Sequence, residues 1–345
     1  MSLIDEIHQQ GDVLQRLLED QFSLVQDIAR NLRANPPEYV FLAARGTSDN
    51  AGRYANYVWG ALNELPVALA TPSLFSLYKQ PPRLKGALVV GISQSGQSPD
   101  IVSVLMEARR QGTHTLAIIN EPESPLAEAA DWVIDIRAGA EKAVAATKSY
   151  TAELLVVAML AAALKDDPAL HHSLKLVPGW VRQALDLEES ILRLVERYRY
   201  MERCVVLGRG YNYATAFEWS LKLKELCYVV AEPYSSADFQ HGPIAIVESG
   251  FPVLAIAPSG AVYPNFLALL QELRQKRAAE LVVISDQAEA LALAQSPMPL
   301  PAGIPEWLSP LAAIIPGQLF AYALTRVKGY STEAPRNLSK VTETH

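Results

Sequence analysis

The sequence predicts an α/β protein with two tandem doubly wound domains, each a parallel sheet covered by helices on both faces. Two observations carry this prediction. Short apolar segments of strand length alternate with longer segments whose apolar residues recur at helical spacing, as in parallel βαβ units. The same elements then recur after 164 or 165 residues. An interval this constant indicates a duplicated domain.

Composition sets the class of protein. The chain has 345 residues, of which half are hydrophobic, and a net charge of −7. This length accommodates about two domains with real cores, and the acidic balance argues against a nucleic-acid partner. The longest unbroken apolar run, residues 154–164, is shorter than the roughly 20 residues of a membrane span, and the first residues do not resemble a signal peptide. We therefore expect a cytoplasmic protein without a membrane partner.

The first half of the chain supplies one set of elements. Residues 1–37 should form a helical arm, because apolar side chains follow helical spacing until the breaker Asn35-Pro36-Pro37. A first α/β domain is expected over residues 38–165. The serine at position 98, Pro99 and Gly112 are typical of the start and end of a helix between them. Strands are predicted at 39–45, 87–92, 115–120 and 132–136, and helices at 50–62 and 99–111.

The second half repeats this order after a helical linker over residues 166–198. The second domain is expected over 199–330, followed by a C-terminal tail over 331–345. Arg45-Gly46 recurs as Arg209-Gly210, and five further residues reappear 164 positions on: Gly86, Val89, Ile92, Ser95 and Gly96 as Gly250, Val253, Ile256, Ser259 and Gly260. The hydroxyl-rich loop 93–98 becomes Ala-Pro-Ser-Gly-Ala-Val at 257–262. Only one copy keeps the hydroxyl-rich loop, so we expect one type of site per chain.

The loop 93–98 is the first candidate site. It joins the carboxyl end of a strand to a helix N-terminus, where open α/β sheets bind ligands and free N–H groups attract anions. Its serines and glutamine are neutral donors, and no lysine of the nucleotide-binding P-loop kind is present, so a phosphomonoester fits better than a nucleotide. Thr47 and Ser48, at the end of the preceding strand, would add hydroxyls. Local sequence alone favours an ordinary capped loop equally.

Two partial motifs carry little weight. Residues 91–95 nearly match the nucleophile elbow, but Ser95 stands where that strained turn needs a glycine. Residues 208–213 begin like a dinucleotide fingerprint, but Tyr213 replaces its third glycine. The cysteines, Cys204 and Cys227, form no metal-ligand spacing. We expect neither a metal nor an organic cofactor.

The helix predicted over 216–228 carries the second candidate. Glu218, Lys222 and Glu225 share one helix face. Taken alone, this pattern favours a solvated surface of ion pairs over a carboxylate that a lysine positions as a general base. His241 follows a polar loop expected over 234–240, precedes Gly-Pro and should lie outside regular structure, in either a structural or a catalytic role. The segment 335–340 reads locally as a basic tail.

Together these segments resemble the double sugar-isomerase (SIS) domain family, above all the isomerase half of glucosamine-6-phosphate synthase and the SIS-type glucosamine-6-phosphate deaminases. The resemblance implies two flavodoxin-like SIS domains and spans nearly the whole chain in family order. The motifs that carry it are Arg45-Gly46-Thr47-Ser48, Ser93-Gln94-Ser95-Gly96-Gln97-Ser98, Val144-Ala145-Ala146-Thr147-Lys148, Leu221-Lys222-Leu223-Lys224-Glu225, His241-Gly242-Pro243 and Pro335-Arg336-Asn337-Leu338-Ser339-Lys340.

The resemblance also implies roles for individual residues. Glu225 would move a proton between C1 and C2 of the sugar, steadied by Lys222 and Glu218. His241 would open the sugar ring from the partner subunit of a homodimer, and Lys340 would touch the open-chain sugar near its carbonyl. The residues implied to bind substrate are Ser93, Gln94, Ser95 and Ser98 at the phosphate, Thr47, Ser48, Val144 and Ala146 at the sugar, and Ser339 in the tail.

Departures from the family pattern narrow the expected activity. The sequence shows no glutaminase domain with an N-terminal cysteine nucleophile, so we expect glutamine not to be the nitrogen donor. Ala146 stands where synthases carry serine, and Gln97 and Ser98 replace glutamate and threonine. This pattern favours a glucosamine-6-phosphate deaminase that releases ammonia and fructose 6-phosphate. The alternatives are a deaminase, deglycase or isomerase for another phosphosugar, and a non-catalytic sugar-phosphate sensor.

Overall fold

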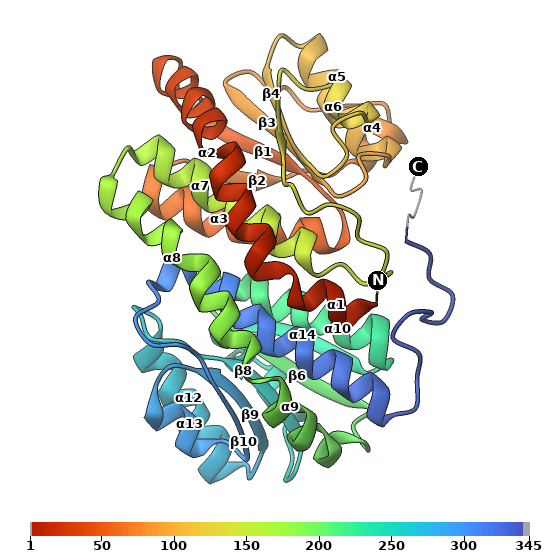
Figure 1. Ribbon diagram of the computed structural model, residues 1–345, viewed down its shortest axis with the longest axis vertical. Helices are drawn as coiled ribbons and strands as arrows, with labels where there is room; N and C mark the ends of the chain where they lie inside the picture. Colours follow the sequence, from red (N-terminus) through yellow and green to blue (C-terminus); the bar gives the residue numbers. More distant parts are fainter. Residues whose placement is uncertain (1, 341–345) are drawn as a thin grey trace. The chain divides into compact units, whose positions relative to one another are not determined.

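The computed structural model describes residues 2–340, which form two compact units (Figure 1). Of these, residues 12–141, 146–176 and 339–340 make up one unit, here called the N-terminal unit. The C-terminal unit holds residues 2–11, 142–145 and 177–338. Each unit therefore takes short segments from elsewhere in the chain, and each contains its own sheet.

The N-terminal unit contains a five-stranded parallel sheet in the order β2-β1-β3-β4-β5. Its buried centre, β3, pairs with β1 and β4, and residues such as Val89, Leu105 and Ile119 form the core beneath α5. The strands are β1 (Tyr39–Ala43), β2 (Val67–Leu69), β3 (Ala87–Ser93), β4 (His114–Ile119) and β5 (Trp132–Asp135). The helices are most of α2 (Gln10–Ala34), α3 (Gly46–Asn63), α4 (Ser73–Ser76), α5 (Pro99–Arg110), α6 (Pro125–Glu128), α7 (Lys148–Lys165) and the first half of α8 (Pro168–Leu185).

The C-terminal unit contains a second five-stranded parallel sheet, in the order β10-β9-β8-β6-β7. Its strands are β6 (Arg203–Gly208), β7 (Val230–Ser235), β8 (Pro252–Ile256), β9 (Glu280–Ser285) and β10 (Ser296–Pro299). The helices are α1 (Leu3–His8), α9 (Glu188–Leu194), α10 (Tyr213–Cys227), α11 (Ser236–Gln240), α12 (Tyr263–Lys276), α13 (Ala288–Leu293) and α14 (Ser309–Val327), with short 3-10 helices η1 (Val195–Tyr198), η2 (Gly210–Asn212), η3 (Pro243–Ile246) and η4 (Glu306–Leu308).

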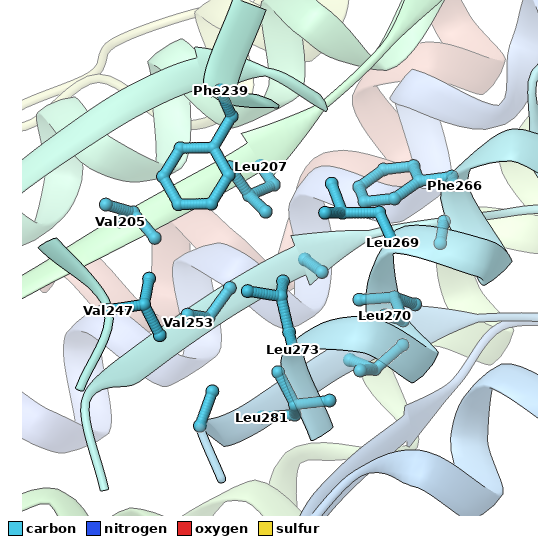
Figure 2. Packing of buried hydrophobic residues seen from close by; sticks show 14 of the residues in the cluster. Val205, Leu207, Phe239, Val247, Val253, Phe266, Leu269, Leu270, Leu273 and Leu281 are labelled. Carbon is cyan, nitrogen blue, oxygen red and sulfur yellow. The ribbon is translucent and has the colours of Figure 1, made fainter. Parts of the chain in front are cut away.

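Helices cover both faces of this second sheet. α12 and α13 lie on one side, whereas α10 and α14 pack together on the other (Figure 1). Figure 2 shows the core on the α12 side, where Leu269 and Leu273 face Val205 of β6 and Val253 of β8. Alternate residues of each strand thus point into different layers, as a doubly wound domain requires.

The two sheets confirm the predicted duplication. β1 to β5 and β6 to β10 follow the same spatial order. The backbone repeats as well: Gly46 and Gly210 have φ of 54° and 59°, and Gly86 and Gly250 have φ of 82° and 78°. Left-handed values of this kind suit glycine because a Cβ would be strained there. Residues 164 positions apart therefore keep the same turn geometry.

Three local expectations need correction. Thr47 and Ser48 lie in the first turn of α3 rather than at the end of a strand, because left-handed Gly46 turns the chain directly into the helix. Residues 234–240 form the end of β7 and α11 instead of a polar loop, since Ser235 accepts the Ala237 N–H and caps α11. β2 and α4, both short, were not predicted.

One helix passes a length-and-composition test for a membrane span. Within residues 2–340, only the stretch Glu306–Val327, which contains α14, is long and apolar enough. The most apolar 18 residues of that stretch are completely buried, and α14 packs against α10 and α9. A core helix meets the same criterion, so the composition of α14 follows from its burial.

Candidate functional site

The serine-rich loop lies at the carboxyl edge of the N-terminal unit's sheet, between β3 and α5. Ser93 Oγ accepts the Gly96 N–H at 3.0 Å, and the Gly96 carbonyl accepts the Leu126 N–H at 3.2 Å. A Cβ on Gly96 would lie only 2.2 Å from Ser124 Oγ. The loop is therefore fixed in a shape that only glycine allows at this position.

This loop exposes the side chains that the sequence assigned to phosphate. Ser93 is buried and shapes the loop, whereas Gln94, Ser95 and Ser98 are half-buried at its surface. Ser98 occupies the N-cap position of α5, yet within the described chain its hydroxyl makes no capping bond. Hydroxyl and amide donors next to a helix N-terminus can hold a phosphate dianion.

An ion pair fastens the neighbouring helix start to this loop. Arg45, just before α3, donates from Nε and Nη2 to Asp100 Oδ2 at 2.8 and 2.7 Å. Asp100 lies in the first turn of α5 and is 1% exposed. The pair brings the first turn of α3 beside that of α5. Ser48 is buried and donates to Glu153 Oε1 of α7 at 2.8 Å, so its hydroxyl supports the helix packing, while Thr47 is half-buried.

A second cluster in the N-terminal unit surrounds Glu141. This fully buried carboxylate accepts the backbone N–H groups of Thr147 and Ser149 at 3.0 and 3.1 Å, and the Ser149 hydroxyl at 2.7 Å. Lys340 of the tail donates to Glu141 Oε2 at 2.9 Å. Burial alone would raise the pKa of Glu141, but the Lys340 charge and these hydrogen bonds lower it below its usual value. Glu141 thus stays ionised and joins the tail to the segment that carries Ala146.

Val144 lies in the part of this segment that belongs to the C-terminal unit. There the buried carboxylate of Glu6 accepts the N–H groups of Lys142 and Ala143 at 2.5 and 3.3 Å. Val144 and Ala146 are half-buried, whereas the alanines that precede them in sequence are buried. This alternation leaves the two residues assigned to the sugar at the surface of the segment. Ser339 is exposed in the tail.

The C-terminal unit holds the carboxylate–lysine cluster on α10. Lys222 Nζ donates to Glu225 Oε2 at 2.7 Å and lies 3.2 Å from Glu218 Oε1. The Lys222 and Glu218 side chains are 1% and 0% exposed, whereas Glu225 is 25% exposed. Burial alone would lower the pKa of Lys222, but the charges of Glu218 and Glu225 raise it above its usual value. The sequence pattern's favoured interpretation, a solvated face, is wrong because α10 packs between the sheet and α14.

His241 lies in the same unit, on an exposed turn between α11 and η3. Its N–H donates to the carbonyl of Asp238 at 3.0 Å, which closes the end of α11. The expectation that this histidine lies outside regular structure is confirmed. The structure places this residue at the surface of the C-terminal unit.

The second copy of the serine loop is closed by its own carboxylates. Asp286 accepts both the N–H and the hydroxyl of Ser259 at 2.6 Å, and Glu306 accepts the Ala261 N–H at 2.8 Å. A Cβ on Gly260 would lie 2.1 Å from Glu306 Cδ. Donors in this loop are therefore already bonded to carboxylates within the unit.

Several supporting residues escaped prediction from the sequence. Asp100, Glu141, Glu153 and Glu6 all act through buried bonds to backbone or to motif residues. In the sequence each is a single acidic residue, and its position relative to the motifs does not indicate its role. No group of three or more potential metal ligands occurs within residues 2–340.

The chain is thus a duplicated α/β protein. One domain has an open serine-rich loop, and the other has a buried carboxylate–lysine cluster. It belongs to the SIS domain family, whose pattern fits residues 36–163 and 199–326.

Individual similar proteins agree with this assignment. A glutamine–fructose-6-phosphate aminotransferase (isomerizing) of Gloeobacter violaceus is 34% identical over 359 aligned residues, which cover 98% of this chain but 58% of that protein. The chain thus spans little more than half the length of such curated relatives. Among solved structures, a provisionally named phosphosugar isomerase from Silicibacter pomeroyi is 33% identical, with a TM-score of 0.86 and coverage of 96% and 100%. The C-terminal domain of glucosamine-fructose-6-phosphate aminotransferase from Francisella tularensis is 29% identical, with a TM-score of 0.87 and coverage of 96% and 98%.

Proposed function

We propose that this protein is a phosphosugar enzyme that deaminates glucosamine 6-phosphate to fructose 6-phosphate and ammonia. The names of the similar aminotransferases and of the similar phosphosugar isomerase support the substrate class. A glucosamine-6-phosphate deaminase from Thermotoga maritima shares the fold at 20% identity and a TM-score of 0.82, but this likeness extends to the fold alone.

The cluster on α10 carries the proposal. A lysine buried with two carboxylates costs more to desolvate than a surface pair, and simple ligand binding does not require it. Lys222 is held by Glu218 from one side and Glu225 from the other, and only Glu225 retains substantial exposure. Glu225 is thus a carboxylate fixed in position with one side open, which suits a proton shuttle.

The proposed reaction has three steps. His241 of the partner subunit in a homodimer assists opening of the pyranose to the aldehyde form. Glu225 takes the proton from C2 while the C1 carbonyl oxygen gains a proton, which gives an enolamine. Glu225 then returns its proton to C1 and the amino nitrogen loses a proton, so that C1 becomes a hydroxymethyl group and C2 an imine. Water adds to that imine and ammonia leaves, which gives the ketone of fructose 6-phosphate.

The other candidate residues bind and orient the substrate. Ser93, Gln94, Ser95 and Ser98 hold the phosphate at the α5 N-terminus. Lys340, paired with Glu141, presents an ammonium to the open-chain carbonyl. The remaining contacts to the sugar come from Thr47, Ser48, Val144, Ala146 and Ser339.

A direct assay tests the proposal. Purified protein is incubated with glucosamine 6-phosphate, and ammonia and fructose 6-phosphate are measured together, with unphosphorylated glucosamine as control. We expect both products in equal amounts from the phosphorylated sugar alone. Neither product, together with a thermal shift on adding the sugar phosphate, would contradict the deaminase and favour a sensor or another amino-sugar phosphate.

A further inference from the structure

A cation–aromatic contact holds the tail in the C-terminal unit. The guanidinium carbon of Arg336 lies 4.5 Å from the ring centroid of Tyr228 and 4.9 Å from that of Tyr330. The backbone N–H of Arg336 also donates to Tyr228 Oη at 2.7 Å. We call these three residues the Arg336 clamp. A planar guanidinium stacks on aromatic rings in a way that a lysine ammonium does not, which gives this contact a defined geometry.

The clamp is attached to the helix that carries Glu225. Tyr228 is the C-cap of α10, with φ of 55°, and its N–H donates to the Leu223 carbonyl. Glu64, 164 positions earlier, ends α3 with the same φ of 55°. The helix-end backbone is therefore common to both copies, and the aromatic ring is particular to the second. A bulky residue in the left-handed region is uncommon, and here its ring forms the clamp.

The tail continues from the clamp to Lys340 through residues whose side chains are exposed. Residues 336–339 are exposed, and Lys340 follows with its ammonium on Glu141. Upstream, Glu333 accepts the Leu3 N–H at 3.1 Å. Arg336 thus stacks on two aromatic rings four residues before the lysine assigned to the sugar carbonyl.

We propose that the Arg336 clamp is a positioning device that fixes the tail relative to α10 and thereby presents Lys340 to the substrate. This inference rests on the proposed sugar-phosphate function. If the clamp is lost, Lys340 occupies its working position only part of the time, so catalytic efficiency falls with that fraction.

The test compares disrupting and conservative variants. Arg336→Gln and Tyr330→Ala break the clamp, whereas Tyr330→Phe keeps the ring. Arg326→Gln is the matched control, because it removes an arginine that lies over another tyrosine, Tyr322, in α14. Hydrogen exchange of the peptide covering residues 331–340, the thermal midpoint, and kcat and KM for glucosamine 6-phosphate are measured for each.

We expect faster tail exchange and about a tenfold lower kcat/KM in Arg336→Gln and Tyr330→Ala. Tyr330→Phe should behave like the wild type, and all thermal midpoints should stay near that of Arg326→Gln. Wild-type kcat/KM in both disrupting variants, or unchanged tail exchange, would overturn the proposal.

Failure of the deaminase proposal gives a different result. If the wild type releases no product, the clamp is judged by tail exchange with and without glucosamine 6-phosphate. Protection of the tail by this sugar in the wild type and Tyr330→Phe, but not in Arg336→Gln, would support the clamp. Absence of any protection in the wild type would overturn it.

Discussion

The three charged residues on one face of α10 lie in two different environments. Lys222 and Glu218 are sealed in the core, and Glu225, on the same face, reaches the surface. Spacing of three and four residues predicts only that the side chains are neighbours. Whether such neighbours are solvated or buried depends on α14, which lies more than 80 residues further along the chain. Glu225 is the candidate base because its two partners are buried while it keeps access to solvent, and the spacing alone does not show this.

Glu225→Gln tests that assignment. The amide keeps the shape and a hydrogen-bond acceptor for Lys222 but cannot take a proton from C2. We expect turnover of glucosamine 6-phosphate to fall at least about 100-fold, with little change in sugar-phosphate binding by calorimetry. Glu232→Gln, an exposed carboxylate on β7, is the control and should be unaffected. Turnover of Glu225→Gln within about tenfold of wild type would refute the role.

At the scale of single elements, the serine loop shows how a glycine fixes the shape of a candidate binding surface. Gly96 combines a left-handed φ of 65° with close contacts to Ser124 and Ile119. Gly112, at the end of α5, has a similar φ of 73° but open space around its Cβ position. The two positions separate backbone strain from steric overlap.

Gly96→Ala and Gly112→Ala should therefore differ. Both substitutions should lower the free energy of unfolding by about 1–2 kcal/mol, because alanine is strained in the left-handed region. Gly96→Ala should lower it by about 1–3 kcal/mol more through overpacking and should weaken phosphosugar binding, whereas Gly112→Ala should bind normally. Denaturant unfolding and calorimetry measure the two effects. Equal stability and equal affinity of the two variants would show that the loop adapts to a side chain.

Most elements were predictable from sequence, and the exceptions have physical causes. Long apolar strands are recognisable from local sequence, and so are helices such as α5, which begins with Ser98-Pro99 and ends before Gly112. β2 has three residues, half-buried or exposed, and provides too little pattern. The candidate loop was recognisable because its donors are consecutive in the chain. Glu141 and Glu6 were not, because Lys340 and the backbone of Lys142 are brought to them from 199 and 136 residues away.

The tail contact at Glu141 predicts a dependence on pH. The pKa of Glu141 is lowered in the folded protein, so the folded state binds fewer protons than the unfolded state near the usual value of 4.5. Its contribution to stability is present above that value and is lost as pH falls through the lower folded pKa. We expect the stability advantage of wild type over Glu141→Gln, measured by denaturant unfolding, to shrink below about pH 4.5. An advantage that grows with acid would contradict the sign.

At the scale of the whole chain, the two copies of the loop differ in the groups that accept hydrogen bonds from their backbone N–H donors. In the first copy, the loop donors bond to the loop's own serines, and half-buried hydroxyls remain at its surface. In the second, Asp286 and Glu306 occupy backbone N–H groups that a phosphate would need. A carboxylate also repels a dianion at close range. We therefore expect the anion site in the first copy alone.

This difference predicts one phosphosugar bound per chain. Titration calorimetry of the Glu225→Gln variant with glucosamine 6-phosphate avoids turnover and should give a stoichiometry near one. Adding Gly96→Ala to that variant should abolish or strongly weaken all of the binding, because no second loop is available to replace the first. Adding Asp286→Ala should leave the high-affinity stoichiometry unchanged, since it acts only on the second copy. Two equivalent sites per chain, or full binding that survives Gly96→Ala, would mean that the carboxylates of the second copy yield to phosphate and that both loops work.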